Sequence, residues 1–342
     1  MSTAPRPSPL EPRLDPYRAR VYRVAFAFAA AWNVAFGLFA GLAPQAFFTL
    51  LRLDPPRYPA IWQCLGMVVG LYGAGYAYAA WRLDRARPFN AIGLAGKLLG
   101  PIGLVFTIRS GEWPLRTVTL CFLNDLVWWA PFALFLLEGT RLRERLRDAA
   151  PWICAALNAA AAAGMLFAIR PGTEMVPDAA ARAAYIAAHP FAWRGAWALW
   201  LCAATSLLGF YAWWGARLAP AAARWGAAAF AVAAAGLLCD FAAESVFIGW
   251  LPDRLEPTAR AAGLLSGLGA NGLYSIGGML LTARTGAPLL GWKRTWAWTI
   301  WACGLGLSAA TLAGSVPAIV ACSAALMTLF VPFAAWLGRA AR

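Results

Sequence analysis

Apolar residues follow one another along this chain in long blocks, which short polar segments separate. Each block holds about twenty residues and ends at Arg, Pro or Asp. At ~1.5 Å per helical residue, a block of that length matches a bilayer hydrocarbon core of ~30 Å. The pattern predicts ten transmembrane helices, at residues 21–43, 59–81, 89–108, 115–137, 151–170, 191–215, 225–250, 260–283, 294–313 and 316–338.

Composition strengthens this interpretation. Of the 342 residues, 61% are apolar and only 13% are charged, and the mean hydropathy is +0.60. Soluble domains carry roughly 25% charged residues. A chain with so few charges cannot cover itself with polar surface, so we expect an all-α, polytopic transmembrane helical bundle in a lipid bilayer.

The basic residues indicate how the chain is oriented. The net charge is +14, but the Arg and Lys residues lie singly or in short runs between the apolar blocks. This distribution is typical of membrane topology and not of nucleic-acid binding, so no nucleic-acid partner is expected. Alternate loops hold 19 basic residues on one side and nine on the other. Both termini are therefore predicted to be cytoplasmic. The abundance of Ala and Arg indicates a bacterial protein of the inner membrane.

Two further segments divide the chain. Residues 1–20 are rich in Pro and Arg and predict a disordered cytoplasmic tail without a cleaved signal peptide. The segment from Glu138 to Ala150 is the longest charged connection. It predicts a boundary between a four-helix module over 21–140 and a six-helix module over 151–338.

The first module carries a recognisable layout. Arg23 enters the first helix, Gly41 to Pro44 close it, an amphipathic stretch runs from Gln45 to Leu53, and the second helix is Gly-rich through Gly66, Gly70 and Gly73. In this layout residues of about 20–140 resemble the DoxX-like superfamily of bacterial membrane proteins. The resemblance implies a compact four-helix bundle and an association with membrane-bound redox or quinone-linked complexes. It carries over no catalytic residue.

Ionisable side chains inside the spans form a first candidate cluster. Lys97 and Asp125 each lie about nine or ten residues from a flanking Arg, which places both ~14–15 Å deep. Because consecutive antiparallel helices pack as neighbours, an ion pair between them is expected, with Asn124 or Trp128 nearby. The pair either fixes the register of the bundle or has a function, which would be to relay protons or to hold an anionic head group.

The seventh predicted span holds a second cluster. Asp240 and Glu244 are four residues apart and therefore share one helix face. We expect Arg194 and Asn271 to converge on them from neighbouring spans. A stripe of small residues is expected to let the eighth span pack closely against this face, and its members are Gly263, Gly267, Asn271 and Ser275. The cluster is either a structural network or a polar binding or proton site.

The outer connection adds a histidine and a helix. His189 is expected at the outer mouth, as a proton donor or as a solvated residue, and the segment Ala179 to Ala188 is expected as a short lid helix or a loop.

The seven cysteines lie inside apolar blocks without a Cys-x-x-Cys pair, and there is a single His. No metal site and no cofactor are therefore predicted.

Three functional hypotheses remain open. The first is an accessory membrane protein of a redox or envelope-maintenance complex, which follows from the resemblance. The second is a proton-coupled carrier of a small amphipathic solute, with Asp240 and Glu244 as proton sites. The third is an enzyme acting on a lipid or quinone, with Glu244, His189 and Arg194 as acid, base and anion clamp.

Overall fold

The computed structural model describes residues 14–253, 255, 258–287 and 289–340, and these are helical with short connections. Within these described residues, ten helical segments are long and apolar enough to cross a membrane. They span Pro16–Leu42, Pro59–Trp81, Leu83–Arg109, Leu115–Leu136, Arg141–Gly172, Pro190–Gly215, Pro220–Gly249, Thr258–Arg284, Trp292–Ala313 and Val316–Ala340. The predicted all-α, polytopic fold is confirmed, and the chain is built as an integral membrane protein.

Two predicted polar segments are partly helical. Helix α1 (Pro16–Leu42) begins inside the predicted tail, because the Asp15 side chain accepts hydrogen bonds from the backbone N–H groups of Tyr17 and Arg18 and caps the helix. Burial acts to raise the pKa of Asp15, but the hydrogen bonds and charge of Arg18 outweigh it and hold that pKa below its usual value. Residues 1–13 of the predicted tail lie outside the described residues.

The predicted charged connection from Glu138 to Ala150 is also mostly helix. Helix α7 (Arg141–Gly164) begins after the N-cap Thr140, whose side chain accepts a hydrogen bond from the Arg143 backbone. Arg and Glu are good helix formers, and an Arg147–Glu144 ion pair of 2.7 Å stabilises the first turns. The connection between the fourth and fifth spans is therefore much shorter than predicted.

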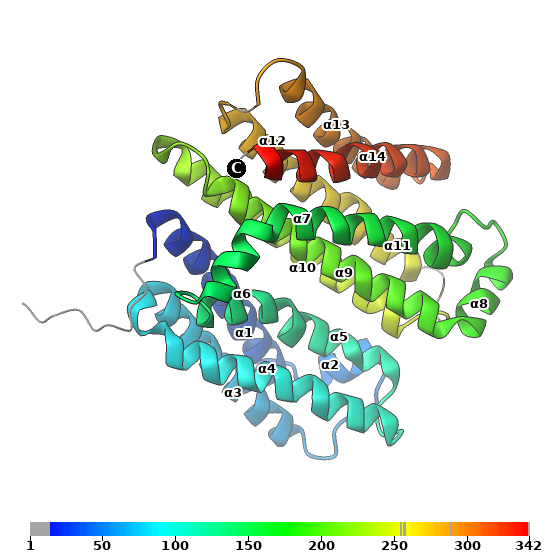
Figure 1. Cartoon of the computed structure of the whole chain (residues 1–342). Helices are drawn as coiled ribbons and strands as arrows, with labels where there is room; N and C mark the ends of the chain where they lie inside the picture. The colour runs from blue at the N-terminus through cyan, green and yellow to red at the C-terminus, as the bar shows by residue number, and fades with distance from the viewer. Residues whose placement is uncertain (1–13, 254, 256–257, 288, 341–342) are drawn as a thin grey trace, which may run out of the picture.

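The first module comprises α1, α2 (Pro44–Leu51), α3 (Pro59–Trp81), α4 (Ala86–Arg109) and a composite fourth span. That span joins α5 (Val118–Cys121), a π-helical turn (Phe122–Leu126) and α6 (Val127–Leu136). Helices α1 and α3 approach closely through glycines, since a Cβ at Gly37 would lie 2.7 Å from the Gly70 Cα. In Figure 1 these helices form the lower group.

The second module is a closed ring of six long helices, the upper group in Figure 1. In ring order they are α7, α9 (Pro190–Gly215), α10 (Ala223–Gly249), α12 (Asn271–Arg284), α13 (Trp292–Ala313) and α14 (Val316–Ala340), and α14 packs back on α7. Before α12 come α11 (Thr258–Gly263) and a π-helical segment (Leu264–Ala270). Short α8 (Ala179–Ala188) lies at one end of the ring, so the helix expected there is confirmed.

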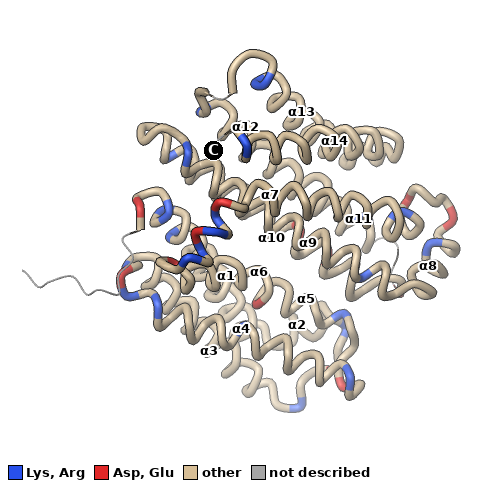
Figure 2. Tube along the Cα trace, in the orientation of Figure 1, with Lys and Arg blue, Asp and Glu red and all other residues tan. Residues whose placement is uncertain are grey.

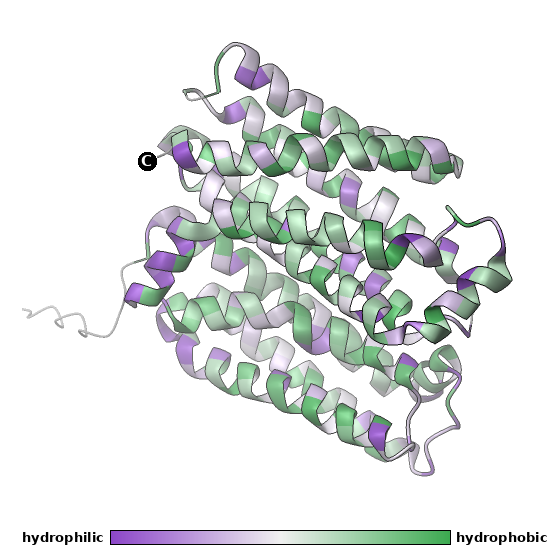
Figure 3. Cartoon of the chain, turned by 45° about the vertical axis from the view of Figure 1, so that its right-hand side comes forward, coloured by the Kyte–Doolittle hydropathy of each residue, from purple (hydrophilic) through white to green (hydrophobic). Residues whose placement is uncertain are grey.

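The charges and apolar faces fit a bilayer. Figure 2 shows charged residues gathered at the two ends of the bundle, and Figure 3 shows hydrophobic residues along the helices between them. Large apolar side chains such as Leu71, Phe106 and Leu312 are exposed on the outside, where a soluble protein would place polar ones. Helix α1 begins at the same side of the bundle at which helix α14 ends (Figure 1).

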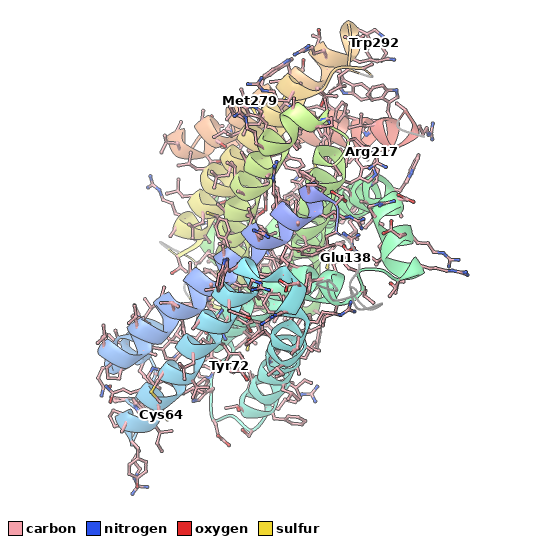
Figure 4. All side chains as sticks on the ribbon, turned by 90° about the vertical axis from the view of Figure 1, so that its left-hand side faces the viewer. Cys64, Tyr72, Glu138, Arg217, Met279 and Trp292 are labelled. Carbon is pink, nitrogen blue, oxygen red and sulfur yellow. The ribbon has the colours of Figure 1, made fainter. Side chains whose placement is uncertain are left out.

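Helix α10 joins the two modules, because it packs against α9 and α12 in the ring and against α1 and α5 of the first module. Near its end, the Trp250 indole donates a hydrogen bond of 3.1 Å to Thr119. At the opposite side Glu138 is buried and accepts hydrogen bonds from Arg18, Tyr22 and Arg143. Figure 4 shows Glu138 between Tyr72 of α3 and Arg217 at the end of α9.

Candidate functional site

The predicted ion pair in the first module is present. Lys97 and Asp125 are 4% and 6% exposed, and Lys97 Nζ lies 4.0 Å from Asp125 Oδ1. The Lys97 ammonium also donates to the Asn124 carbonyl, and the Asn124 amide donates to Asp125 over 3.1 Å. Of the two predicted neighbours, Asn124 is therefore the one that bonds to the pair, while the Trp128 indole donates to the Leu123 carbonyl. Trp129 completes the group by donating to the Lys97 carbonyl. This cluster neutralises its own charges.

Glycine lets the pair form. A Cβ at Gly100 would lie 3.0 Å from Asp125 Oδ2, so the absence of a side chain there leaves room for the carboxylate against α4. Asp125 sits in the π-helical turn Phe122–Leu126, and such a turn carries one extra residue that turns a side chain to a different face. The turn directs Asp125 toward Lys97.

The second module holds a carboxylate of a different kind. Asp240 is 2% exposed and accepts hydrogen bonds of 2.8 Å from Ser266 and Tyr274, one on each oxygen. Both donors are neutral hydroxyl groups. Among the described residues no Lys, Arg or His forms a salt bridge with Asp240. The negative charge of an ionised Asp240 therefore has no counter-ion among the described residues, in contrast to that of Asp125.

A cavity of about 50 Å³ lies beside Asp240, in the middle of the helix ring. All six ring helices contribute to its wall. Asn158 of α7, Asn271 and Ser275 of α12 supply polar groups, and Trp200, Trp301 and Phe330 supply aromatic ones. A buried space with several polar neighbours and a carboxylate has the composition of a binding site for a small molecule.

Glu244 lies one turn from Asp240 on α10 and is 0% exposed. Neither of its carboxyl oxygens is exposed on the surface or has a hydrogen-bond partner among the described residues. The Glu244 side chain is therefore buried and unpaired within the described part of the chain. A carboxyl group in such surroundings is far more stable as the neutral acid than as the anion.

Only part of the predicted convergence is found. Asp240 and Asn271 line one cavity, but the predicted contact of Arg194 with Glu244 is not made, since both Glu244 oxygens lack partners. Arg194 is half-buried near the start of α9, where the polar end of the span begins. His189 is exposed at the junction of α8 and α9, with its ring 4.8 Å from that of Tyr185. The Glu244, His189 and Arg194 trio expected for an enzyme is therefore not assembled.

The stripe of small residues on the eighth span does not lie wholly against the predicted helix. A Cβ at Gly267 would meet Thr311 of α13, and a Cβ at Gly304 of α13 would meet the Ser275 hydroxyl. Asn271, in contrast, lines the same cavity as Asp240 of α10. The π-helical segment Leu264–Ala270 is the reason, because its extra residue shifts the faces that a regular 3.6-residue period predicts. The same shift brings Ser266 to Asp240.

Sequence reasoning missed Ser266, Tyr274 and Asn158 as site residues. Tyr274 follows Asn271 by three residues, a helical spacing that could have indicated it. Ser266 could not be placed without knowledge of the π-helical segment. Asn158 donates to the Cys154 carbonyl over 2.9 Å and reaches the cavity from α7, so its role depends on the ring closing.

Taken together, the fold and these buried groups define a polytopic membrane protein with a cavity beside a buried carboxylate inside its second module. Comparisons of this chain with protein-family models, with curated proteins and with solved structures found no match. The resemblance of the first module to the DoxX-like superfamily therefore stays a prediction. Any function is inferred from the site alone.

Proposed function

We propose that this protein is a proton-coupled carrier of a small solute, with Asp240 and Glu244 as its proton sites. The observation that supports the proposal is that both carboxyl groups are buried in the membrane-spanning part and have no basic partner in the described ranges of the chain. Intramembrane acids are costly, and a purely structural role favours pairing, as in the Lys97–Asp125 cluster. Groups that are left unpaired are available to bind and release protons.

The cavity would be the solute site, and the present arrangement would be a closed form. A volume of about 50 Å³ holds roughly three or four water molecules and no larger solute. In this form Glu244 would carry its proton, and the ring would have to open for the proton and the solute to exchange with water. The π-helical segment before α12 is a suitable place for such a movement, because its backbone departs from the regular helix next to Ser266.

The proposed orientation places both termini in the cytoplasm of a bacterial cell. It is supported by the excess of basic residues, 19 against nine, in the loops on the side of the termini. The carrier would then lie in the inner membrane, with α8 and His189 at the outer face.

Transport can be tested in proteoliposomes that contain a pH-sensitive dye. We would impose gradients of a quaternary ammonium ion, a sugar alcohol and a dicarboxylate, none of which crosses protein-free liposomes at an appreciable rate. At least one gradient should move protons with the parent protein, and Asp240→Asn and Glu244→Gln should each abolish that movement. Asp148→Asn and Glu112→Gln, at exposed positions, are the matched controls. Identical signals from the parent and both site variants would remove the carrier hypothesis.

A second candidate function concerns the first module. A largely apolar cavity of about 280 Å³ lies between α1, α2 and the fourth span, with Trp32, Thr119 and Asn124 among its lining residues. A lipid or quinone bound there would agree with the membrane redox or envelope complexes that the DoxX-like resemblance implies. Filling the cavity by Ala35→Phe should reduce the amount of apolar molecule that mass spectrometry detects with the purified protein. An unchanged amount would argue against binding at this place.

A further inference from the structure

We propose that the solute is a small organic cation, and that it exchanges with a proton at Asp240. This inference rests on the proposed carrier function but makes a separate claim about charge. Its basis is the combination of one carboxylate, neutral hydrogen-bond donors and aromatic side chains around a cavity, with no Lys, Arg or His among the described residues of its wall.

The charge of the cavity is the first step. Each Asp240 oxygen accepts one hydrogen bond from a neutral hydroxyl, which leaves one further acceptor position on each oxygen. Asp240 is the only ionisable acid or base among the cavity-lining residues, apart from the phenol of Tyr274. An anion or dicarboxylate would meet a like charge there, and a neutral solute would leave an ionised Asp240 without a counter-ion. A proton and an organic cation both supply the missing positive charge.

The aromatic residues are the second step. Trp200, Trp301 and Phe330 line the same cavity as Asp240. The faces of such rings attract alkylammonium groups through their quadrupoles, and ammonium ligands are commonly held by several aromatic side chains together with a carboxylate. A metal ion would instead need several oxygen, nitrogen or sulfur ligands. Within the described residues, no group of three or more His, Cys, Asp and Glu side chains could hold one.

The size of the cavity limits the solute further. About 50 Å³ admits a group of a few non-hydrogen atoms. An alkylammonium head group is of that size. Met327, an unbranched and flexible side chain, forms part of the wall and could move to admit a somewhat larger body.

Exchange follows from the two steps. Because proton and cation both neutralise the Asp240 carboxylate, binding of one releases the other from the same oxygen atoms. A carrier built in this way moves a cation in one direction and a proton in the opposite direction. Glu244, one turn away and without a partner, would remain protonated while the cation is bound, since a second negative charge has no counter-ion there.

Calorimetric titration of the purified protein in detergent tests the inference. The probes are tetramethylammonium, whose charge does not change with pH, the neutral tert-butanol of the same size, and the pivalate anion. Tetramethylammonium should bind at least tenfold more tightly than either of the others. As the pH is lowered through the range in which the carboxyl group becomes protonated, the affinity for tetramethylammonium should fall by roughly tenfold for each pH unit. Asp240→Asn keeps the shape of the side chain and should abolish this selectivity and the pH dependence, whereas Asp148→Asn should keep both.

The outcomes separate the solute class from the carrier function. Binding of tert-butanol or pivalate as tight as that of tetramethylammonium would overturn the inference, as would undetectable binding of the cation or unchanged selectivity in a folded Asp240→Asn protein. If the cation binds selectively but moves no protons in liposomes, the site stands and the carrier function fails. If only neutral or anionic solutes drive protons, the carrier function stands and the cation inference fails.

Discussion

Buried carboxylates in this protein occur in two different electrostatic surroundings. Asp125 faces Lys97 at 4.0 Å, whereas Asp240 has only hydroxyl donors and Glu244 has none. The sequence could predict the first pair, because two opposite charges at equal depth on consecutive helices must meet. It could not predict that Arg194 leaves Glu244 unpaired. Arg194 lies near the polar end of its span, where its side chain can remain hydrated.

Because Lys97 and Asp125 neutralise each other, removing either charge alone should destabilise the protein. Lys97→Met should lower the free energy of unfolding by about 3 kcal/mol, because it leaves a buried carboxylate without a counter-charge. Asp125→Asn should have a similar effect by leaving the ammonium unpaired. The double variant, in which both charges are removed, should be more stable than either single variant. Thermal unfolding in detergent of all four proteins would measure this, and a double variant as unstable as the sum of the two changes would contradict a structural pair.

At the level of helices, the hydropathy pattern predicted the spans well but not their internal irregularities. The predicted span 59–81 coincides with α3. The predicted spans 294–313 and 316–338 leave only Gly314 and Ser315 between them, and α13 does end there, with Gly314 at a φ of 67° where glycine is favoured. The π-helical segments at Phe122–Leu126 and Leu264–Ala270 have no signal in a period of 3.6 residues. For this reason the contacts of Gly267 and Ser275 with α13 were not predicted, and Ser266 was missed.

The contact of α1 with the second module offers a test at this level. The Tyr17 ring lies against Gly215 of α9 and Gly226 of α10, and a Cβ at Gly215 would lie 2.1 Å from the Tyr17 hydroxyl. Gly215→Ala should therefore destabilise the protein by about 2 kcal/mol through overpacking. In a Tyr17→Ala background the same Gly215→Ala change should cost much less, because the clashing ring is gone. An equal cost of Gly215→Ala in both backgrounds would mean that Gly215 is needed for another reason.

At the level of the whole molecule, the sequence predicted the number of spans but not the ring. Hydropathy shows which segments enter the bilayer, whereas the order of neighbours depends on side-chain packing between segments distant in the chain. The contact of α14 with α7, which closes the ring around the cavity, joins residues far apart in sequence. Asn158 lines the cavity only because the ring closes in this way. The sequence around Asn158 therefore gives no indication that it belongs to the site.

The orientation of the molecule is open to a direct test. The excess of basic residues in the loops on the side of the termini predicts a cytoplasmic C-terminus. A fluorescent protein fused after Arg342 should therefore be bright, and alkaline phosphatase fused there should be inactive, since that enzyme matures only outside the cytoplasm. The opposite pair of results would invert the proposed faces of the carrier and place α8 inside the cell.

The central claim is that Asp240 binds either a proton or a cation, and counting protons tests it most directly. The heat of tetramethylammonium binding would be measured at pH values from 5 to 8 in two buffers with different ionisation enthalpies, which gives the number of protons released. We predict that the number approaches about one proton per cation at the acidic end and falls toward zero as pH rises, and that Asp240→Asn releases none. Cation binding without proton release at any of these pH values would contradict the account.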